Sequence, residues 1–559
     1  MNKLKTIKNY LSSQWYWILF ALFTIVYIKG LFNLVYGIDA KIYASISRDI
    51  AETGTWMEIY HKGGDYLDKP PLLFWLSAIS YKIFGFSPFA YKLPSFLFTL
   101  LGVFSTYKLG ELLYNKTVGK LASFFYYSCF VIVIINQDVR TDTILTGIVV
   151  FSIWQLIKYL KHKTISSFIL GFVGIGLAML AKGPLGLMIP VLALGTEFII
   201  KKQWSNIFRW EWLLGLAIVA LVLFPMAYGL YTQFDAQRPD KTFNLASGKV
   251  VQDFSGLKFY FWEQSFGRVF GGNSEGWKND AGPFFFVHNF LWSFLPWTII
   301  GVLALFVKLK NNFKNVSSNE WFTLGGIILP FIAMSMSSFK LPHYIIPIFP
   351  FWFILTANYF VHLNEKALKK INIAQLIIPF IAIMSIIGLG VFILPFTSIL
   401  EWLFVLILLA VIVYIHFKFE LQTKILLSSS ISMLGIVTML NFYFIPTLSK
   451  YDASIQASKI IKERGIDNVY IVDVGSLGLD VLIENNTQYL NHQKDLEQVA
   501  KQGNAILGPK KWIEKRLKGT LKPKEIIVFG HRELSRITPK FLDPKTRGDQ
   551  LTTYYLAIF

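Results

Sequence analysis

Carboxylate, lysine and tyrosine side chains gather between Asp39 and Pro71, directly after the first long apolar stretch of the chain. Asp39 and Tyr43 stand four residues apart, so the two side chains would share one face of a helix. A carboxylate in a partly apolar pocket is suited to accept a proton, which makes Asp39 a candidate general base with Tyr43 in support. The alternative is a solvated aspartate or a helix cap, and this pair alone does not decide between them.

The motif Tyr-Leu-Asp-Lys-Pro-Pro at residues 66–71 combines groups that bind phosphate. Its two prolines restrict the backbone and hold Lys69 toward an extended conformation. A lysine ammonium is a point-charge ligand for phosphate, and a tyrosine hydroxyl can donate to a phosphate oxygen. Tyr66 and Lys69 are therefore predicted to hold a phosphate, with Asp68 in support. A lysine that reaches toward a membrane interface would show the same pattern.

The short segment Gln137–Asp142 carries three more charged groups, Asp138, Arg140 and Asp142. They are predicted to form an ion-pair network that orients a catalytic acid. The alternative is that they cap the helix that follows.

Two further turns contain ionisable residues. Lys182 lies between two short apolar segments, where an ionisable group indicates a functional site unless its ammonium extends to the interface. Lys340, His343 and Tyr344 precede another apolar stretch and offer a set of donors, or an interfacial anchor.

The composition indicates a membrane protein. Of the 559 residues, 54% are hydrophobic and only 16% are charged, whereas soluble domains carry about 25% charged residues. The net charge of +20 could attract nucleic acid, but the basic residues form short clusters between apolar stretches, as in cytoplasmic loops. No nucleic-acid partner is therefore predicted. The single cysteine, Cys129, excludes an intrachain disulfide.

Thirteen apolar segments are candidates to span a membrane, for which about 20 residues are needed. The first is interpreted as a retained span and not a signal peptide, because no clear small-residue cleavage site follows it. The segments lie near residues 14–36, 90–112, 119–136, 143–160, 165–181, 183–200, 211–232, 284–307, 320–338, 343–361, 373–394, 399–417 and 425–446.

The lysine and arginine clusters predict the orientation of these spans. With the N-terminus in the cytoplasm, every cluster falls on the inner side, as the positive-inside rule requires. The clusters are Lys116 and Lys120; Lys158, Lys161 and Lys163; Lys201, Lys202 and Arg209; Lys308, Lys310 and Lys314; Lys366, Lys369 and Lys370; Lys418 and Lys424. The polar turns and the loops 37–89 and 233–283 then face the periplasm. The expected location is the bacterial inner membrane, with the C-terminal part in the periplasm.

The chain changes character after residue 448. A helical pattern at Ile455–Arg464 ends at Gly465, and short β-rich apolar runs follow near 469–474, 505–507, 525–529 and 553–559. This alternation predicts a small α/β domain over 449–559, beside a membrane domain over 1–448. The segment Val-Asp-Val-Gly-Ser-Leu-Gly lacks a full dinucleotide-binding pattern, so a lid or docking domain is the favoured interpretation.

Taken together, the motifs resemble a known family. Asp-x-x-x-Tyr after the first span, Tyr-x-Asp-Lys-Pro-Pro, Arg-x-Asp before the fourth span, Ala-Lys-Gly-Pro and Lys-Leu-Pro-His-Tyr occur in the order seen in the aminoarabinose transferases. These belong to the GT-C polytopic glycosyltransferases, which are related to the protein O-mannosyltransferases. The resemblance extends from Asp39 to Tyr344, and the layout of spans plus an outer domain covers essentially the whole chain.

The resemblance implies an activity and roles for individual residues. The expected reaction is transfer of a sugar, with inversion, from a polyprenyl (undecaprenyl) phosphate donor to lipid A, a glycan or a protein at the periplasmic face. Asp39 matches the essential carboxylate of the family and Asp142 its second acid. The residues expected around the donor phosphate are Tyr66, Lys69, Tyr344 and Arg268.

The chain departs from the family pattern at three places. Ile42 replaces an arginine of the first motif, and Asp68 stands where the lipid A enzymes usually have glutamate. The Glu-His…Arg-Phe pattern of the long loop survives only as Glu263, Gln264 and Arg268. Without that histidine no metal ligand set is defined, so no cofactor is predicted and the need for a divalent metal stays open.

Two other functions fit part of the pattern. A protein O-mannosyltransferase-type enzyme would act on serine or threonine of exported proteins. A flippase or transporter of lipid-linked sugars would usually show internal repeats and ionisable groups near the membrane midplane. No clear repeat is present and the polar groups gather on one side, which favours an enzyme.

Overall fold

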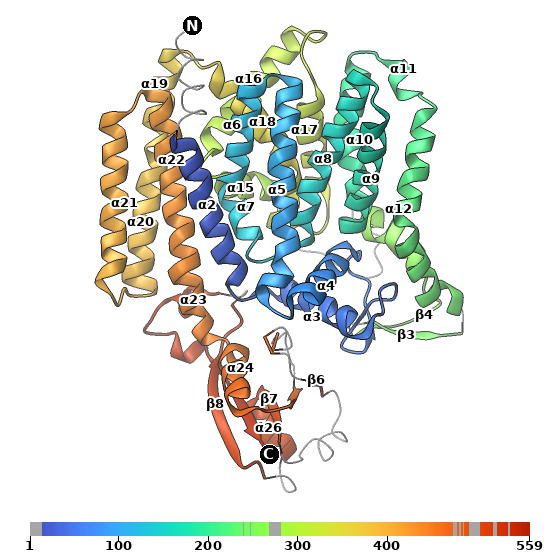
Figure 1. Ribbon diagram of the computed structural model, residues 1–559, viewed down its shortest axis with the longest axis vertical. Helices are drawn as coiled ribbons and strands as arrows, with labels where there is room; N and C mark the ends of the chain where they lie inside the picture. Colours follow the sequence, from blue (N-terminus) through green and yellow to red (C-terminus); the bar gives the residue numbers. More distant parts are fainter. Residues whose placement is uncertain are drawn as a thin grey trace.

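The computed structural model describes residues 14–238, 240–245, 248–267, 281–472, 478–479, 482–483, 486–490, 503–517, 522–534 and 537–559. Within these ranges, a bundle of apolar helices carries a small sheet at one end (Figure 1). Nine helical segments of the described chain are long and apolar enough to cross a membrane. They are Gln14–Phe32, Pro88–Leu113, Thr141–His162, Ile165–Lys182, Trp204–Gln237, Pro342–Val361, Glu365–Ile393, Ile399–Lys418 and Leu421–Tyr451.

The bundle is built from many helices, some of them broken into two pieces. Its first half contains α2 (Gln14–Phe32), α5 (Pro88–Leu113), α6 (Lys116–Tyr127), α7 (Phe130–Ile135), α8 (Thr141–His162), α9 (Ile165–Lys182), α10 (Leu185–Ile200), α11 (Trp204–Ile207) and α12 (Glu211–Gln233). Its second half contains α15 (Phe285–Ser293), α16 (Thr298–Lys314), α17 (Phe322–Met336), the 3-10 helix η3 (Pro342–Ile348), α18 (Phe349–Val361), α19 (Glu365–Gln375), α20 (Ile377–Gly388), η4 (Leu389–Ile393), α21 (Ile399–Lys418), α22 (Leu421–Met439), η5 (Leu440–Phe444) and α23 (Ile445–Leu448).

Each predicted span falls on helical structure. The segment near 119–136 is divided between α6 and α7, and the segment near 284–307 between α15 and α16. Several of the remaining helices, including α10 and α17, are shorter than 18 residues. The polytopic helical fold is therefore confirmed, whereas the count of thirteen spans stays a prediction.

Glycines allow the central helices to approach closely. A Cβ at Gly147 of α8 would lie 2.1 Å from the carbonyl oxygen of Phe98 in α5. A Cβ at Gly119 of α6 would lie 2.3 Å from the carbonyl oxygen of Tyr107, also in α5. Small residues at helix contacts are the usual means of close packing in membranes, where lipid removes much of the hydrophobic driving force. These contacts fix α8, whose first turn carries site residues.

The stretch predicted as the loop 37–89 is mostly helical. It contains α3 (Ile38–Thr53), the short strands β1 (Tyr60–His61) and β2 (Gly64–Asp65), and α4 (Leu72–Phe84). Both helices lie across the end of the bundle, on the side that faces the sheet (Figure 1). The assignment of this stretch as a periplasmic connection between two spans stays a prediction. Helix α3 has too many polar residues to resemble a span, while its apolar residues still cover one buried face.

The long connection after α12 also has local structure. It contains η1 (Asp235–Gln237), the hairpin of β3 (Thr242–Asn244) and β4 (Val250–Gln252), α13 (Gly256–Lys258) and the π-helix η2 (Phe259–Gly267). The hairpin lies at the same end of the bundle as α3 and α4 (Figure 1).

The C-terminal part forms a five-stranded mixed sheet with strand order β6-β5-β7-β9-β8. Its central strand β7 runs parallel to β5 and antiparallel to β9. Helix α24 packs on one face of the sheet and α26 on the other. The elements are η6 (Ser449–Tyr451), α24 (Ala453–Arg464), β5 (Asn468–Ile471), β6 (Asn486–Tyr489), β7 (Asn504–Pro509), α26 (Lys510–Leu517), β8 (Glu525–His531), α27 (Pro539–Leu542), η9 (Gly548–Gln550) and β9 (Thr552–Ile558).

The predicted α/β character of this part is confirmed. Helix α24 ends at Gly465, whose φ of +61° lies in the left-handed region that glycine adopts readily. Strand β6 was missed because its sequence, Asn-Thr-Gln-Tyr, lacks the apolar pattern of the other strands. Residues 473–477 of the glycine-containing segment lie outside the described residues, and the domain boundary at 448 stays a prediction.

Candidate active site

Lys92 of α5 holds the end of α2, just before α3 begins. Lys92 of α5 is fully buried, and its ammonium donates to the backbone carbonyls of Gly30, Asn33 and Leu34 at 3.1, 2.7 and 3.2 Å. The last carbonyls of a helix have no partner within the helix, so a lysine at this place satisfies them. Asp39 follows in the first turn of α3.

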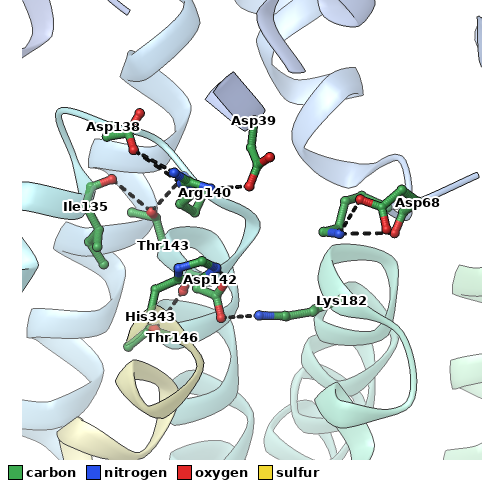
Figure 2. A network of polar contacts seen from close by, with 11 residues as sticks. Asp39, Asp68, Ile135, Asp138, Arg140, Asp142, Thr143, Thr146, Lys182 and His343 are labelled. Carbon is green, nitrogen blue, oxygen red and sulfur yellow. Dashed lines mark hydrogen bonds and ion pairs between the residues drawn. The ribbon is translucent and has the colours of Figure 1, made fainter. Parts of the chain in front are cut away.

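Arg140 joins two carboxylates that come from different parts of the chain. Its guanidinium forms an ion pair with Asp39, and its Nη2 lies 2.9 Å from Asp138 Oδ2 (Figure 2). The other oxygen of Asp138 accepts a hydrogen bond from the backbone N–H of Gly37 at 3.0 Å. Asp138 therefore holds both the arginine and the start of the helix that carries Asp39.

Gly37 is required by this close approach. A Cβ at Gly37 would lie 2.0 Å from Asp138 Oδ1 and 2.6 Å from the carboxyl carbon. The φ of Gly37 is −72°, which any residue can adopt, so the constraint is one of space and not of backbone conformation.

The surroundings of Asp39 differ from the expected apolar pocket. Its side chain is 40% exposed and paired with Arg140, whose side chain is 19% exposed. Burial lowers the pKa of Arg140, but the Asp138 and Asp39 carboxylates more than offset this, so that the pKa is raised overall. The arginine therefore remains a cation that holds Asp39 in place.

Tyr43 packs against the site from inside. Its ring is 3% exposed and lies 5.5 Å from that of Phe74 in α4. Burial raises the pKa of Tyr43 well above its usual value, and the nearby Tyr66 and Asp39 raise it further. The hydroxyl thus stays protonated and can serve as a hydrogen-bond donor.

Asp142 belongs to a second cluster, separate from the Arg140 network. Its side chain, 2% exposed, forms an ion pair with Lys182 at the end of α9. His343 Nε2 lies 3.6 Å from the other carboxylate oxygen, and the Lys182 ammonium lies 3.9 Å from the centre of the Tyr344 ring. The single network expected of Asp138, Arg140 and Asp142 was therefore wrong, because Asp142 points in from the first turn of α8 toward α9 and η3 (Figure 2).

Lys182 contacts protein groups at the end of α9. Its ammonium is held between Asp142 and Tyr344, and its side chain is 12% exposed. A cation at the C-terminal end of α9 and a carboxylate in the first turn of α8 are each favoured by the helix dipoles.

Lys69 forms a third charged group, with Asp68. Its ammonium lies 2.6 Å from Asp68 Oδ2, and its side chain is 15% exposed. Gln264 of η2 donates to the backbone carbonyl of Asp68 and so ties this segment to the long connection after α12. Figure 2 shows Asp68 on the same side of the site as Lys182, across from Arg140.

Tyr66 and Lys69 line one pocket. Its walls are mostly apolar and include residues of the lipid-exposed helix α12. The lining residues are Met57, Ile59, Tyr66, Leu67, Lys69, Pro70, Pro71, Met226, Leu230, Gln233 and Tyr260. A single lysine in an apolar wall suits a ligand with an anionic head and a hydrocarbon tail.

Lys340 contacts a segment near the long connection. The Lys340 ammonium donates to the backbone carbonyl of Ala281 at 2.8 Å, next to the long connection. Arg268 lies outside the described residues. Across the parts of the chain that the structure describes, no group of three or more His, Cys, Asp or Glu could hold a metal ion, and the metal question stays open.

One contact of α3 was not foreseen. Lys41 forms a buried ion pair with Asp452, at 2.9 Å, on the side of α3 that faces the C-terminal sheet. The two residues are 411 positions apart, Lys41 fills an unspecified position of the Asp-x-x-x-Tyr motif and Asp452 belongs to no motif, so no sequence signal could have joined them.

Comparison with known proteins shows what this chain is similar to. Residues 68–228 match the family model described as dolichyl-phosphate-mannose-protein mannosyltransferase. The undecaprenyl phosphate-alpha-4-amino-4-deoxy-L-arabinose arabinosyl transferase of Enterobacter sp. (strain 638) is 26% identical over 355 residues, 62% of this chain and 60% of that protein. A second transferase of this name, from Proteus mirabilis, is 27% identical and covers 64% of this chain and 61% of that protein.

The match therefore spans about three-fifths of the length of these curated relatives. The fold likeness is more extensive. The structure of ArnT from Cupriavidus metallidurans bound to undecaprenyl phosphate superposes with a TM-score of 0.72, covering 98% of both chains at 16% identity. The chain is thus a multi-pass membrane protein with the GT-C fold. In its motifs and sequence matches it is similar to the aminoarabinose transferases and, over residues 68–228, to the protein mannosyltransferases.

Proposed function

We propose that this protein is an inverting glycosyltransferase that moves a sugar from a polyprenyl-phosphate donor to lipid A or another acceptor of the bacterial envelope. The observation that carries the proposal is that the Asp39–Arg140 pair lies across one site from Asp68, whose carboxylate is paired with Lys69 (Figure 2). The names of the relatives describe transfer of aminoarabinose from undecaprenyl phosphate, which supports this class of donor.

Lys69 and Tyr66 would bind the phosphate of the donor. Both line the pocket whose other walls are mainly apolar and reach α12, so that the first isoprenoid units could leave the site toward lipid. Lys69 is paired with Asp68 in the described structure, and a donor phosphate would compete for the same ammonium. A positive charge at this position would offset the charge that develops on the departing phosphate.

Asp39 would act on the acceptor. In an inverting transfer the acceptor oxygen bonds to the anomeric carbon from the face opposite the phosphate, the bond from that carbon to the phosphate oxygen breaks, and polyprenyl phosphate leaves. If the acceptor is a hydroxyl, Asp39 takes its proton as general base. If the acceptor is an already ionised phosphate, no base is needed and Asp39 orients the sugar.

The second cluster would support the phosphate side of the reaction. Asp142 is buried and holds the Lys182 ammonium above the ring of Tyr344, with His343 on the far side of the carboxylate. This arrangement holds Lys182 and Tyr344 together without exposing the aspartate. Loss of Asp142 would remove the carboxylate that neutralises the Lys182 ammonium.

We place the site on the periplasmic side of the inner membrane, with the N-terminus in the cytoplasm. The support is the charge pattern: α11 and the other basic connections lie at one end of the bundle, and α3, α4 and the sheet at the other (Figure 1). Basic connections favour the cytoplasmic side. In this arrangement residues 1–448 form the membrane domain, and residues 449–559 a periplasmic one.

A protein acceptor is the second candidate. The match of residues 68–228 to the mannosyltransferase family model favours it, because those enzymes are described as acting on proteins. The donor side of the site would be the same, and only the acceptor would differ.

Mass spectrometry of a deletion strain tests the proposal. Lipid A and exported glycoproteins from the deletion and parent strains are compared, with complementation by the wild-type gene and by an Asp39→Asn variant. Loss of one sugar from lipid A, restored only by the wild type, supports the first acceptor, and loss from proteins supports the second. Unchanged lipid A and proteins, with donor accumulating on the inner leaflet, would contradict transferase activity and indicate a flippase.

A further inference from the structure

Helix α3 is held from two opposite sides. Tyr43, Ile46 and Ile50 are buried in the core that the helix shares with the bundle. Lys41 and Arg48 are seven residues apart and therefore lie on one face of the helix. Lys41 contacts Asp452, just before α24, and Arg48 contacts Ile483, between β5 and β6. The helix that carries Asp39 is thus enclosed between the membrane helices and the C-terminal sheet (Figure 1).

The contact at Lys41 is a fully buried ion pair. The side chains of Lys41 and Asp452 are 4% and 2% exposed. Asp452 is itself fixed, because its other oxygen accepts from the backbone N–H of Ser454 at 3.0 Å and so caps α24. His531 of β8 also lies close, with Nδ1 3.8 Å from the same oxygen. The lysine is therefore attached to a rigid point of the sheet and its first helix.

Two further contacts extend this attachment. Arg48 donates to the backbone carbonyl of Ile483 at 2.5 Å, and its guanidinium lies 4.7 Å from the ring centre of Phe86. Gly478, with φ of +66°, lies against the stem of Lys41, where a Cβ would come within 2.9 Å of the lysine Cδ. The residues around β5 are thus shaped to the lysine side chain.

A buried ion pair is a costly way to stabilise a fold, because both charges lose their hydration. Apolar residues of similar volume are often as stable, so such a pair is better explained by the geometry it imposes. The geometry here is the position of α3, because Lys41 lies only two residues from Asp39, the aspartate that the proposed reaction requires.

We propose that the C-terminal sheet is a positioning element of the active site, and that Lys41 and Asp452 are positioning residues which hold α3 so that Asp39 meets Arg140 and the acceptor. This inference rests on the proposed transferase function. Lys41 and Asp452 touch neither donor nor acceptor and act through α3.

The test uses the full-length protein in nanodiscs, with the double variant Lys41→Met and Asp452→Asn. This variant removes both charges together, leaves no unpaired ion, and keeps a residue that can cap α24. We expect kcat for sugar transfer to fall about ten-fold or more while KM for the donor changes less than about two-fold, since Lys69 is untouched. Hydrogen–deuterium exchange over residues 38–53 should become faster, and the unfolding temperature should change little.

Two further variants serve as controls. Lys41→Arg keeps the charge and should retain most of kcat. Arg464→Ala breaks an exposed ion pair with Glu525 in the same part of the chain and should leave both kcat and α3 exchange unchanged. Arg48→Met provides a second test if the double variant is poorly folded, because it removes the contact with Ile483 and leaves Glu52, which is 44% exposed, without its arginine partner.

The outcomes separate the two proposals. Full kcat in the double variant, or unchanged exchange over α3, would overturn the positioning role. A raised donor KM with normal kcat would also overturn it, because it would indicate a binding role. Absence of transfer by the wild type would refute the proposed function instead, and the exchange data would still decide whether the sheet holds α3.

Discussion

Asp39 is held by a guanidinium that is itself held by a second carboxylate. Asp138 binds Arg140 through one oxygen and the backbone of Gly37 through the other, so the position of Asp39 depends on the turn before α8 as well as on its own helix. Catalytic groups act efficiently only when neighbouring residues keep them in place. Single-residue changes at this site can therefore be separated into those that remove a reacting group and those that move it.

Replacing Asp39 by Asn should abolish the proposed base or orienting group while keeping the shape of the side chain. We expect transfer to fall by about a hundred-fold or more, with normal insertion and yield. The measurement is the initial rate with purified protein. The control is Asp253→Asn, because Asp253 is also paired with an arginine, Arg238, but is 63% exposed and outside the site. Full activity of the Asp39 variant would refute its assignment.

Replacing Lys69 by Ala should remove the main charge that faces the donor phosphate. We expect kcat/KM to fall about a hundred-fold, equivalent to about 2.7 kcal/mol of lost transition-state stabilisation, and Lys69→Arg to retain part of it. Steady-state kinetics with varied donor would show this. An equal loss in Asp68→Asn, which leaves the ammonium in place, would argue that the pair acts as a structural unit.

At the scale of elements, the turn at Gly37 and the helix α3 do the positioning. A Cβ at Gly37 would overlap Asp138 Oδ1, so Gly37→Ala must displace either the aspartate or the start of α3. We expect transfer to fall about ten-fold and the protein to lose about 1–3 kcal/mol of stability. The matched control is Gly195→Ala in α10, where nothing lies within 4 Å of the added atom. Equal behaviour of the two variants would contradict the role of Gly37.

The hairpin of β1 and β2 should make stability depend on pH. Burial lowers the pKa of His61 to about 4, from a usual value of 6.5, and Lys62 lowers it further. Because the folded-state pKa is below the unfolded one, the protein is most stable with His61 neutral. This stability is complete above about pH 6.5 and is lost progressively as the pH falls toward 4.

The expected loss between pH 7 and pH 5 is about 2 kcal/mol for this one group. Thermal unfolding of the wild type and of His61→Phe at both pH values isolates the contribution of His61 to the free energy of unfolding, since the two proteins share all other titrating groups. The Nδ1 atom of His61 has no hydrogen-bond partner among the described residues, so replacement by phenylalanine removes no hydrogen bond at that atom. An identical pH dependence of both proteins would contradict the assignment.

At the scale of the whole molecule, hydropathy and charge predicted much of the architecture. The apolar segments became helices, and the β-rich runs after residue 465 became strands, because both patterns are local. The charged motifs were predicted to share one face, and Figure 2 shows most of them together there. Pairings between distant residues were beyond prediction: Asp39 meets Arg140 across 101 positions, and Lys41 meets Asp452 across 411. Only the packed helices determine which charges become neighbours.

Reconstitution of the purified protein gives the most direct test of the central claim. The protein in nanodiscs is supplied with an undecaprenyl-phosphate-linked aminosugar and lipid A, and the products are followed by mass spectrometry, with NMR for the anomeric configuration. We predict a glycosylated acceptor with inverted configuration and free undecaprenyl phosphate from the wild type, and neither product from Asp39→Asn. An intact donor after incubation with wild-type protein and a panel of lipid A, glycan and protein acceptors, or a donor moved across a bilayer without bond cleavage, would contradict the account.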